Sequence, residues 1–183
     1  MEYTRVGSHK ASAVAKVPTQ ERGRLRVIAL LGAAEAIIAE RGYEAATMTE
    51  IAAKAGASIG SLYQFFPTKE AVADALRTRL RDAFMADLDV LAQSARSMTA
   101  EELAARLLGL LPGFFSRHPA FPAIAEARRL PRTSAASVRH GWRAAIARVL
   151  EAYAPDMPET QSAPAAAVVF ELMKANAALS AEP

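Results

Sequence analysis

The segment from Met48 to Phe66 constrains the fold of this chain more than any other. Two short helices that cross through a tight turn need a small residue at the crossing, a glycine at the turn and apolar residues facing inward. Ala52 and Gly56 meet the first two requirements. The predicted inward-facing residues are Ile51, Ala55, Leu62 and Phe65. The segment is therefore predicted to form a helix-turn-helix.

Capping signals and helix breakers divide the remaining chain into helices. Thr47 with Glu50, and Thr99 with Glu102, have the spacing of a capping box, in which the threonine and the glutamate satisfy backbone amides reciprocally. The predicted helices span residues 22–40, 47–56, 58–65 and 68–92, then a fifth helix that begins at Thr99, and then residues 120–130, 134–153 and 159–180. No stretch alternates with period two, so the predicted fold class is all-α.

Two helix ends and one helix face carry specific expectations. In the first predicted helix, Ile28, Leu31 and Ile38 recur at helical spacing and are expected to face the core. Gly42 follows as a stop signal, and Pro112 is expected to disturb the end of the fifth helix, because proline has no backbone N–H.

Composition excludes several classes of protein. The 183 residues include no cysteine, so disulfides and thiolate metal sites are absent and a reducing cytoplasm is the expected location. No apolar run is long enough to span a membrane. The three histidines lack metal-ligand spacing, and neither a nucleophile elbow nor a phosphate-binding glycine loop is present. No enzyme activity, cofactor or metal is therefore expected.

The residues 47–56 and 58–70, together with the turn Arg41-Gly42-Tyr43, resemble the signature of the TetR family. The resemblance implies an all-α regulator with an N-terminal three-helix DNA-binding domain and a C-terminal helical bundle that binds an effector and dimerises. It further implies a homodimer on a palindromic DNA operator, released by a small molecule. The predicted divisions are a basic arm (1–20), a helix-turn-helix domain (21–67) and an effector and dimerisation domain (68–183).

The predicted reading helix, 59–65, exposes side chains suited to DNA. The amide of Gln64 can pair bidentately with adenine, Ser61 can reach a base or a phosphate, and Gly60 permits close approach of the backbone. By resemblance, Tyr63 and Lys69 hold the phosphate backbone. The predicted DNA-binding residues are Thr47, Thr49, Ser58, Gly60, Ser61, Tyr63, Gln64 and Lys69. The alternative roles are packing for Tyr63, capping for Thr47 and a solvated first-turn position for Lys69.

The effector site is expected among large apolar residues of the later helices. The predicted pocket residues are Phe84, Leu88, Leu110, Phe114, Phe121, Trp142 and Phe170. The alternative is that these side chains only fill the core. The polar groups available to orient a ligand are His118, Arg128, Arg139 and His140.

The last predicted helix carries an apolar stripe that suits either a partner subunit or the protein's own core. Its members are Ala166, Val169, Phe170, Met173 and Ala177. A second reading of function also stays open at this point, in which the chain is a helical module that binds a protein or a ligand and does not bind specific DNA.

Overall fold

Helices account for nearly all of the described residues, 19–126 and 132–180, of this computed structural model. The helices are α1 (Thr19–Ala45), α2 (Met48–Lys54), α3 (Ile59–Phe65), α4 (Lys69–Ala95), α5 (Ala100–Arg117), α6 (Ala120–Glu126), α7 (Arg132–Tyr153) and α8 (Glu159–Leu179). No strand occurs in these two ranges. The predicted all-α fold class is confirmed.

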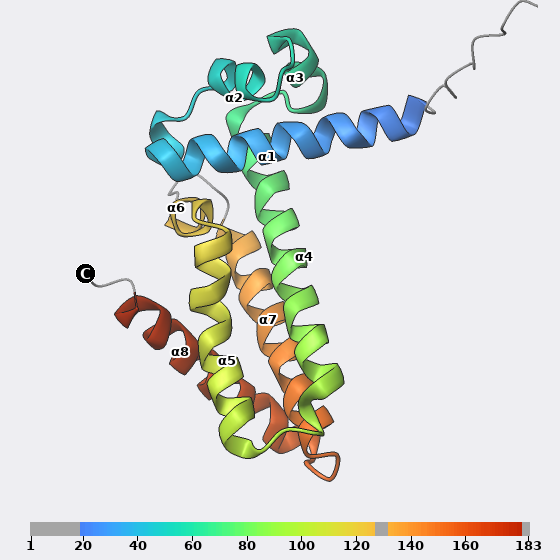
Figure 1. Cartoon of the computed structure of the whole chain (residues 1–183), viewed down its shortest axis with the longest axis vertical. Helices are drawn as coiled ribbons and strands as arrows, with labels where there is room; N and C mark the ends of the chain where they lie inside the picture. Colours follow the sequence, from blue (N-terminus) through green and yellow to red (C-terminus); the bar gives the residue numbers. More distant parts are fainter. Residues whose placement is uncertain (1–18, 127–131, 181–183) are drawn as a thin grey trace, which may run out of the picture.

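The helices form two parts, a head made by α1, α2 and α3 and a stalk made by the bundle of later helices (Figure 1). The helix α1 lies across one end of a bundle made by α4, α5 and α7, while α2 and α3 lie on the other side of α1. Within the bundle α7 packs against both α4 and α8, and α6 packs against α1. The long α4 leads directly from the head into the stalk.

The predicted caps set the helix starts. Thr47 and Glu50 form a complete capping box at α2, and Thr99 and Glu102 form another at α5. The side chains of Ser58 and Thr68 each accept a hydrogen bond from a backbone N–H of the first turn that follows. These bonds satisfy amide groups that a helix start otherwise leaves without partners.

The first helix is longer than predicted, and it buries Leu31 and Ile38 as expected but not Ile28. It begins at Thr19, and Gly42 interrupts its regular geometry with φ +77°, a value that favours glycine. The expectation that Ile28 is buried is wrong, because this side chain is 45% exposed. Figure 1 shows the reason: the first turns of α1 project beyond α2 and α3, so little packs against them.

Pro112, which was expected to disturb the end of the fifth helix, lies inside α5, and the helix continues to Arg117. Proline cannot donate to the carbonyl four residues earlier, which is that of Leu108. Asn176 in α8 supplies the missing donor, because its Nδ2 donates to the Leu108 carbonyl at 3.0 Å. A tertiary hydrogen bond thus replaces the lost helical one.

The apolar stripe of α8 belongs to the protein's own core. Ala166, Phe170, Met173 and Ala177 are buried and Val169 is half-buried. None of the helices in 19–126 and 132–180 is long and apolar enough to cross a membrane. Residues 1–18 of the predicted basic arm, residues 127–130 of the predicted sixth helix and Arg128 lie outside the described residues.

Candidate nucleic-acid interface

The helix-turn-helix forms as the small residues require. Gly56 adopts φ +60° at the turn, and the N–H of Ala57 donates to the carbonyl of Ala52 at 2.9 Å. Ile51, Ala52 and Leu62 are buried beneath α2 and α3. The two short helices are therefore held in a fixed relation by a glycine turn and a shared apolar contact.

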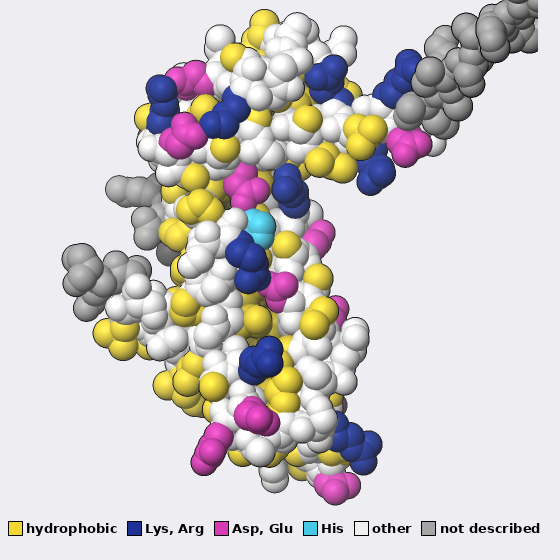
Figure 2. Space-filling model, in the orientation of Figure 1, with side chains coloured by type: hydrophobic (Ala, Val, Ile, Leu, Met, Phe, Trp, Pro, Cys, Tyr) yellow, Lys and Arg dark blue, Asp and Glu magenta, His cyan; other side chains and the backbone are white. Residues whose placement is uncertain are grey.

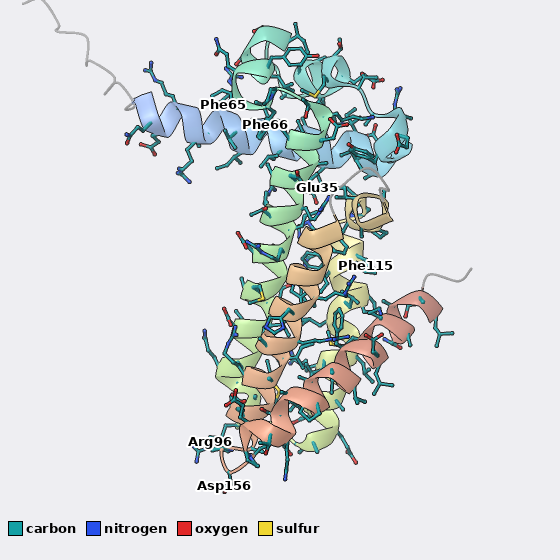
Figure 3. The ribbon with its side chains drawn as sticks, turned by 180° about the vertical axis from the view of Figure 1, so that it is seen from behind. Glu35, Phe65, Phe66, Arg96, Phe115 and Asp156 are labelled. Atoms are coloured by element: carbon teal, nitrogen blue, oxygen red, sulfur yellow. The ribbon has the colours of Figure 1, made fainter. Side chains whose placement is uncertain are left out.

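Phe66 takes the core position that was predicted for Phe65. Phe65 is 38% exposed, whereas Phe66 is 7% exposed (Figure 3 labels both). Residues four apart share a helix face, so Phe66 continues the face of Leu62. The chain turns out of helical geometry at Phe66, which donates its backbone N–H to the Leu62 carbonyl.

The outer face of α3 is free of other described elements. Tyr63 is 49% exposed and Ile59 is 40% exposed. Gly60 and Gln64 are also exposed, and Ser61 is half-buried. The reading in which the chain does not bind DNA would be favoured if Gln64, Tyr63 and Lys69 were buried or occluded. Gln64 and Tyr63 are exposed, whereas Lys69 is half-buried.

The N-terminal end of α2, which favours anions, is capped by Thr47 together with the acidic side chain of Glu50. The Thr47 hydroxyl donates to Oε2 of Glu50 at 2.8 Å, and the Glu50 N–H donates to that hydroxyl at 3.3 Å. Arg41 pairs with the other carboxylate oxygen at 2.6 Å. The hydrogen bond from the Thr47 side chain, followed by the Thr47 backbone bond and Arg41, lowers the pKa of Glu50 despite some desolvation. Thr49, one position into α2, is exposed.

Lys69 holds the end of α1. Its Nζ donates to the carbonyls of Tyr43, Glu44 and Ala46 at 3.0, 2.9 and 3.2 Å, and it lies 4.7 Å from the centre of the Tyr43 ring. An ammonium has three N–H donors, and a cation suits the carbonyls at a helix end. The sequence did not predict that Lys69 caps α1. Contact between Lys69 and DNA phosphate stays a prediction.

Five of the seven predicted pocket residues meet in one aromatic cluster, which consists of Phe84, Phe114, Phe121, Trp142 and Phe170. Ring centres lie 4.4 Å apart for Phe84 and Trp142, 5.1 Å for Phe84 and Phe114, and 5.6 Å for Phe121 and Trp142. All five side chains are buried, as is Leu88, while Leu110 is half-buried. In this structure these rings pack against one another.

An open groove lies elsewhere, between α7 and α8. It has a volume of about 780 Å³, and His140, Arg143, Arg148 and Glu151 contribute its polar lining. None of the seven predicted pocket residues lines this groove. Of the polar groups predicted to orient a ligand, His140 lines the groove, Arg139 is exposed, and His118 contacts Glu35 near the head.

The fold and the free reading helix define a helix-turn-helix DNA-binding regulator. Residues 30–76 match the family model "Bacterial regulatory proteins, tetR family". This match places a domain similar to the DNA-binding domain of tetR-family regulators over α2, α3 and the adjoining parts of α1 and α4. A comparison with curated protein sequences finds no match.

Solved structures share the fold over most of the chain. SmeT in complex with triclosan is 22% identical with a TM-score of 0.59, covering 82% of this chain and 79% of SmeT. FadR from Bacillus subtilis in complex with stearoyl-CoA is 17% identical with a TM-score of 0.62, covering 82% and 85%. NalD, the secondary repressor of the MexAB-OprM multidrug efflux pump in Pseudomonas aeruginosa, is 16% identical with a TM-score of 0.56, covering 85% and 83%.

Proposed function

We propose that this protein is a ligand-responsive repressor of the cytoplasm that binds a palindromic operator as a homodimer and is released by a small molecule. The observation that carries the proposal is the free face of α3, where Gly60, Tyr63 and Gln64 are exposed on a rigidly turned helix. A helix of this kind enters the major groove, and two of them read half-sites about 34 Å apart.

The DNA contacts follow from side-chain chemistry. Gln64 reads adenine through its amide, while Ser61 reaches a base or a phosphate. Tyr63, Thr49 and the exposed N-terminal ends of α2 and α3 at Thr47 and Ser58 hold phosphates, because helix starts favour anions. Lys69 adds positive charge beside this surface while it caps α1.

A second copy of the chain is the partner that the outer face of α8 favours. Ala165, Val168, Leu172, Ala175 and Leu179 recur at intervals of three and four residues, the spacing of a helix seam. Val168, Leu172 and Leu179 are 61, 53 and 67% exposed. This outer face lies opposite the buried stripe, so α8 has one apolar side for its own core and another for a partner.

The effector site in this proposal is the aromatic cluster. SmeT was solved with triclosan and FadR with stearoyl-CoA, and both proteins share this fold. A ligand that parts the rings would meet a hydrogen-bond donor, because Nε1 of Trp142 is buried and has no hydrogen-bond partner among the described residues. Such an orphan donor costs free energy that an acceptor on the ligand would recover.

Ligand binding acts on α4 in this proposal. The helix begins at the head and carries Phe84 into the aromatic cluster, so a shift of its body changes the spacing of the two reading helices. The required coupling is about 1 to 3 kcal/mol. A designed disulfide that locks α4 to the head should abolish release from DNA by the ligand. Unchanged release in the locked protein would refute this role of α4.

The deciding experiment is selection from random-sequence DNA at physiological salt, followed by sequencing. Wild type is compared with the Gln64→Ala, Tyr63→Ala double variant, and both are checked for folding by circular dichroism. A palindromic consensus that the variant loses supports the regulator. Salt-sensitive binding without a consensus, or no binding, supports the helical module that binds other partners.

A further inference from the structure

A partly buried carboxylate joins the head to the stalk. Glu35 lies in the middle of α1 between buried Ala34 and Ile37, and its side chain is 14% exposed. Its Oε1 lies 2.7 Å from Nδ1 of His118, and its Oε2 lies 3.7 Å from Nη2 of Arg79 in α4. Figure 3 labels Glu35 where α1 crosses the end of the stalk. One carboxylate thus contacts α4 and the end of α5 from α1.

His118 connects Glu35 to the aromatic cluster. Its ring packs on the ring of Phe114 with centres 4.5 Å apart, and Phe114 packs on Phe84 and Phe121. The backbone N–H of His118 donates to the Phe114 carbonyl at 2.8 Å, and its carbonyl accepts from the N–H of Phe121 at 3.0 Å. The histidine therefore ends α5, orients the start of α6 and touches α1 at the same time.

We propose that the Glu35–His118 contact is the link through which the packing of the aromatic cluster controls the position of the DNA-reading head. This proposal rests on the proposed function, and it assigns a regulatory role to two residues outside the reading helix and outside the aromatic cluster. Glu35 and His118 act as positioning residues.

The physical basis is that a partly buried carboxylate is costly without partners. When Phe114 moves to admit a ligand, the His118 ring that rests on it moves as well, and Glu35 loses its closest partner. The head, which α1 carries, then leaves the arrangement that the contact stabilises. A ligand shifts the equilibrium by its different affinity for the two arrangements, so the link converts ring packing into DNA affinity.

A double-mutant cycle on operator binding tests the link. Phe114→Leu alters the ring beneath His118 and is expected to weaken binding of the selected operator roughly fivefold or more. In a Glu35→Ala background the same change should alter the affinity by less than about twofold, because the contact is already absent. His118→Phe keeps a ring on Phe114 and removes the donor, and it should abolish the effect of Phe114→Leu in the same way.

The matched control is Asp89→Asn. Asp89 pairs with Arg148 at 3.0 Å between α4 and α7, near the end of α4 that lies away from the head. Phe114→Leu should keep its full effect in this background. Equal effects of Phe114→Leu in the wild-type and Glu35→Ala backgrounds would overturn the link, whatever the effect of either change on thermal stability.

Amide hydrogen exchange of residues 31–38 separates failure of the link from failure of the proposed function. Phe114→Leu should speed exchange in this part of α1 when Glu35 is present and add nothing when Glu35 is absent. If wild type selects no operator but this pattern is seen, the proposed function fails and the link stands. If exchange responds equally in both backgrounds, the link fails even when the operator is bound.

Discussion

Glu50 shows how one side chain serves both the fold and the DNA-facing surface. Its carboxylate closes the capping box with Thr47 and pairs with Arg41. The hydrogen bonds from Thr47 lower the pKa of Glu50 below its ordinary value of 4.5 in the folded protein. A carboxyl group with a lowered folded pKa contributes stability that is present above the unfolded pKa and is lost as the pH falls through the folded pKa.

We expect Glu50→Gln to destabilise the protein at pH 7, and the difference from wild type to shrink as the pH falls below 4.5. Glutamine keeps the capping geometry and removes the charge, so the comparison isolates the ionised form. Thermal unfolding measured from pH 7 to pH 3 checks this prediction. A difference in midpoint that grows toward low pH would contradict it.

Substitutions of Gln64 and Tyr63 are expected to weaken DNA binding in different ways. Gln64→Ala removes a base reader and should cost about 1 to 3 kcal/mol of affinity for the selected operator, with little change on unrelated DNA. Tyr63→Phe removes a hydroxyl that contacts phosphate and should weaken binding to both DNAs alike. Fluorescence anisotropy with the two DNAs at one salt concentration measures both effects, and a sequence-independent loss in Gln64→Ala would argue against base reading.

At this scale the sequence predicts roles where one local geometry dominates. Thr47, Ser58, Gly56 and Leu62 are placed as predicted because caps, turns and the crossing act within a few residues. Lys69 is different, since its three carbonyl acceptors lie 23 to 26 positions earlier in the chain. No local pattern indicates such a contact.

The continuation of α5 past Pro112 depends on a hydrogen bond from α8. The Nδ2 atom of Asn176 donates to the Leu108 carbonyl, which Pro112 leaves without its helical donor. We expect Asn176→Ala to cost about 1 kcal/mol, because it leaves a partly buried carbonyl without a partner. In a Pro112→Ala background, where residue 112 regains its N–H, the cost should be smaller.

Urea denaturation of the four proteins in this cycle measures the coupling. Additive losses in the double variant would mean that the two residues act independently. The same pair explains why the end of α5 was not predictable: the donor that allows the helix to continue lies 68 positions from the carbonyl it serves.

Helix starts were more predictable than helix faces. The starts of α2, α3, α4 and α5 each follow a residue whose side chain caps the helix, and such residues are visible in the sequence. The exposure of Ile28 depends on how far α1 projects past α2 and α3, which is a property of the assembled head.

The helix α8 has apolar side chains on two opposite faces. One face is buried in the protein's own core, and the other is exposed. Figure 2 shows hydrophobic side chains interspersed with charged ones along the visible face of the stalk. We expect the combined change Val168→Glu and Leu172→Glu to convert a dimer into a monomer, because two charges would face the same charges of a second copy. Operator binding should fall with it.

Val90→Glu is the matched control, since Val90 is 65% exposed on α4 and lies outside the α8 seam. It should leave the dimer intact. Analytical ultracentrifugation of the three proteins at micromolar concentration measures the outcome. A protein that stays dimeric with both changes on α8 would show that the dimer interface lies on another surface.

The two halves of the candidate site were predictable to different degrees. The reading helix and its turn follow from residue types at fixed offsets, so its exposed residues could be named in advance. The aromatic residues could be named as well, but whether they enclose space or fill it depends on packing among α4, α5, α6, α7 and α8. The link between Glu35 and His118 joins positions 83 apart and had no sequence signal beyond a glutamate in an apolar stretch.

The aromatic cluster also gives the protein an optical reporter. The chain has a single tryptophan, and its indole lies within the cluster with ring centres of Phe84, Phe121 and Phe170 4.4, 5.6 and 5.9 Å away. All tryptophan emission therefore comes from the proposed effector site, without labelling. A compound that parts the rings and accepts a hydrogen bond from the indole should shift that emission to longer wavelength, so a library can be screened on the unmodified protein by following one fluorescence maximum.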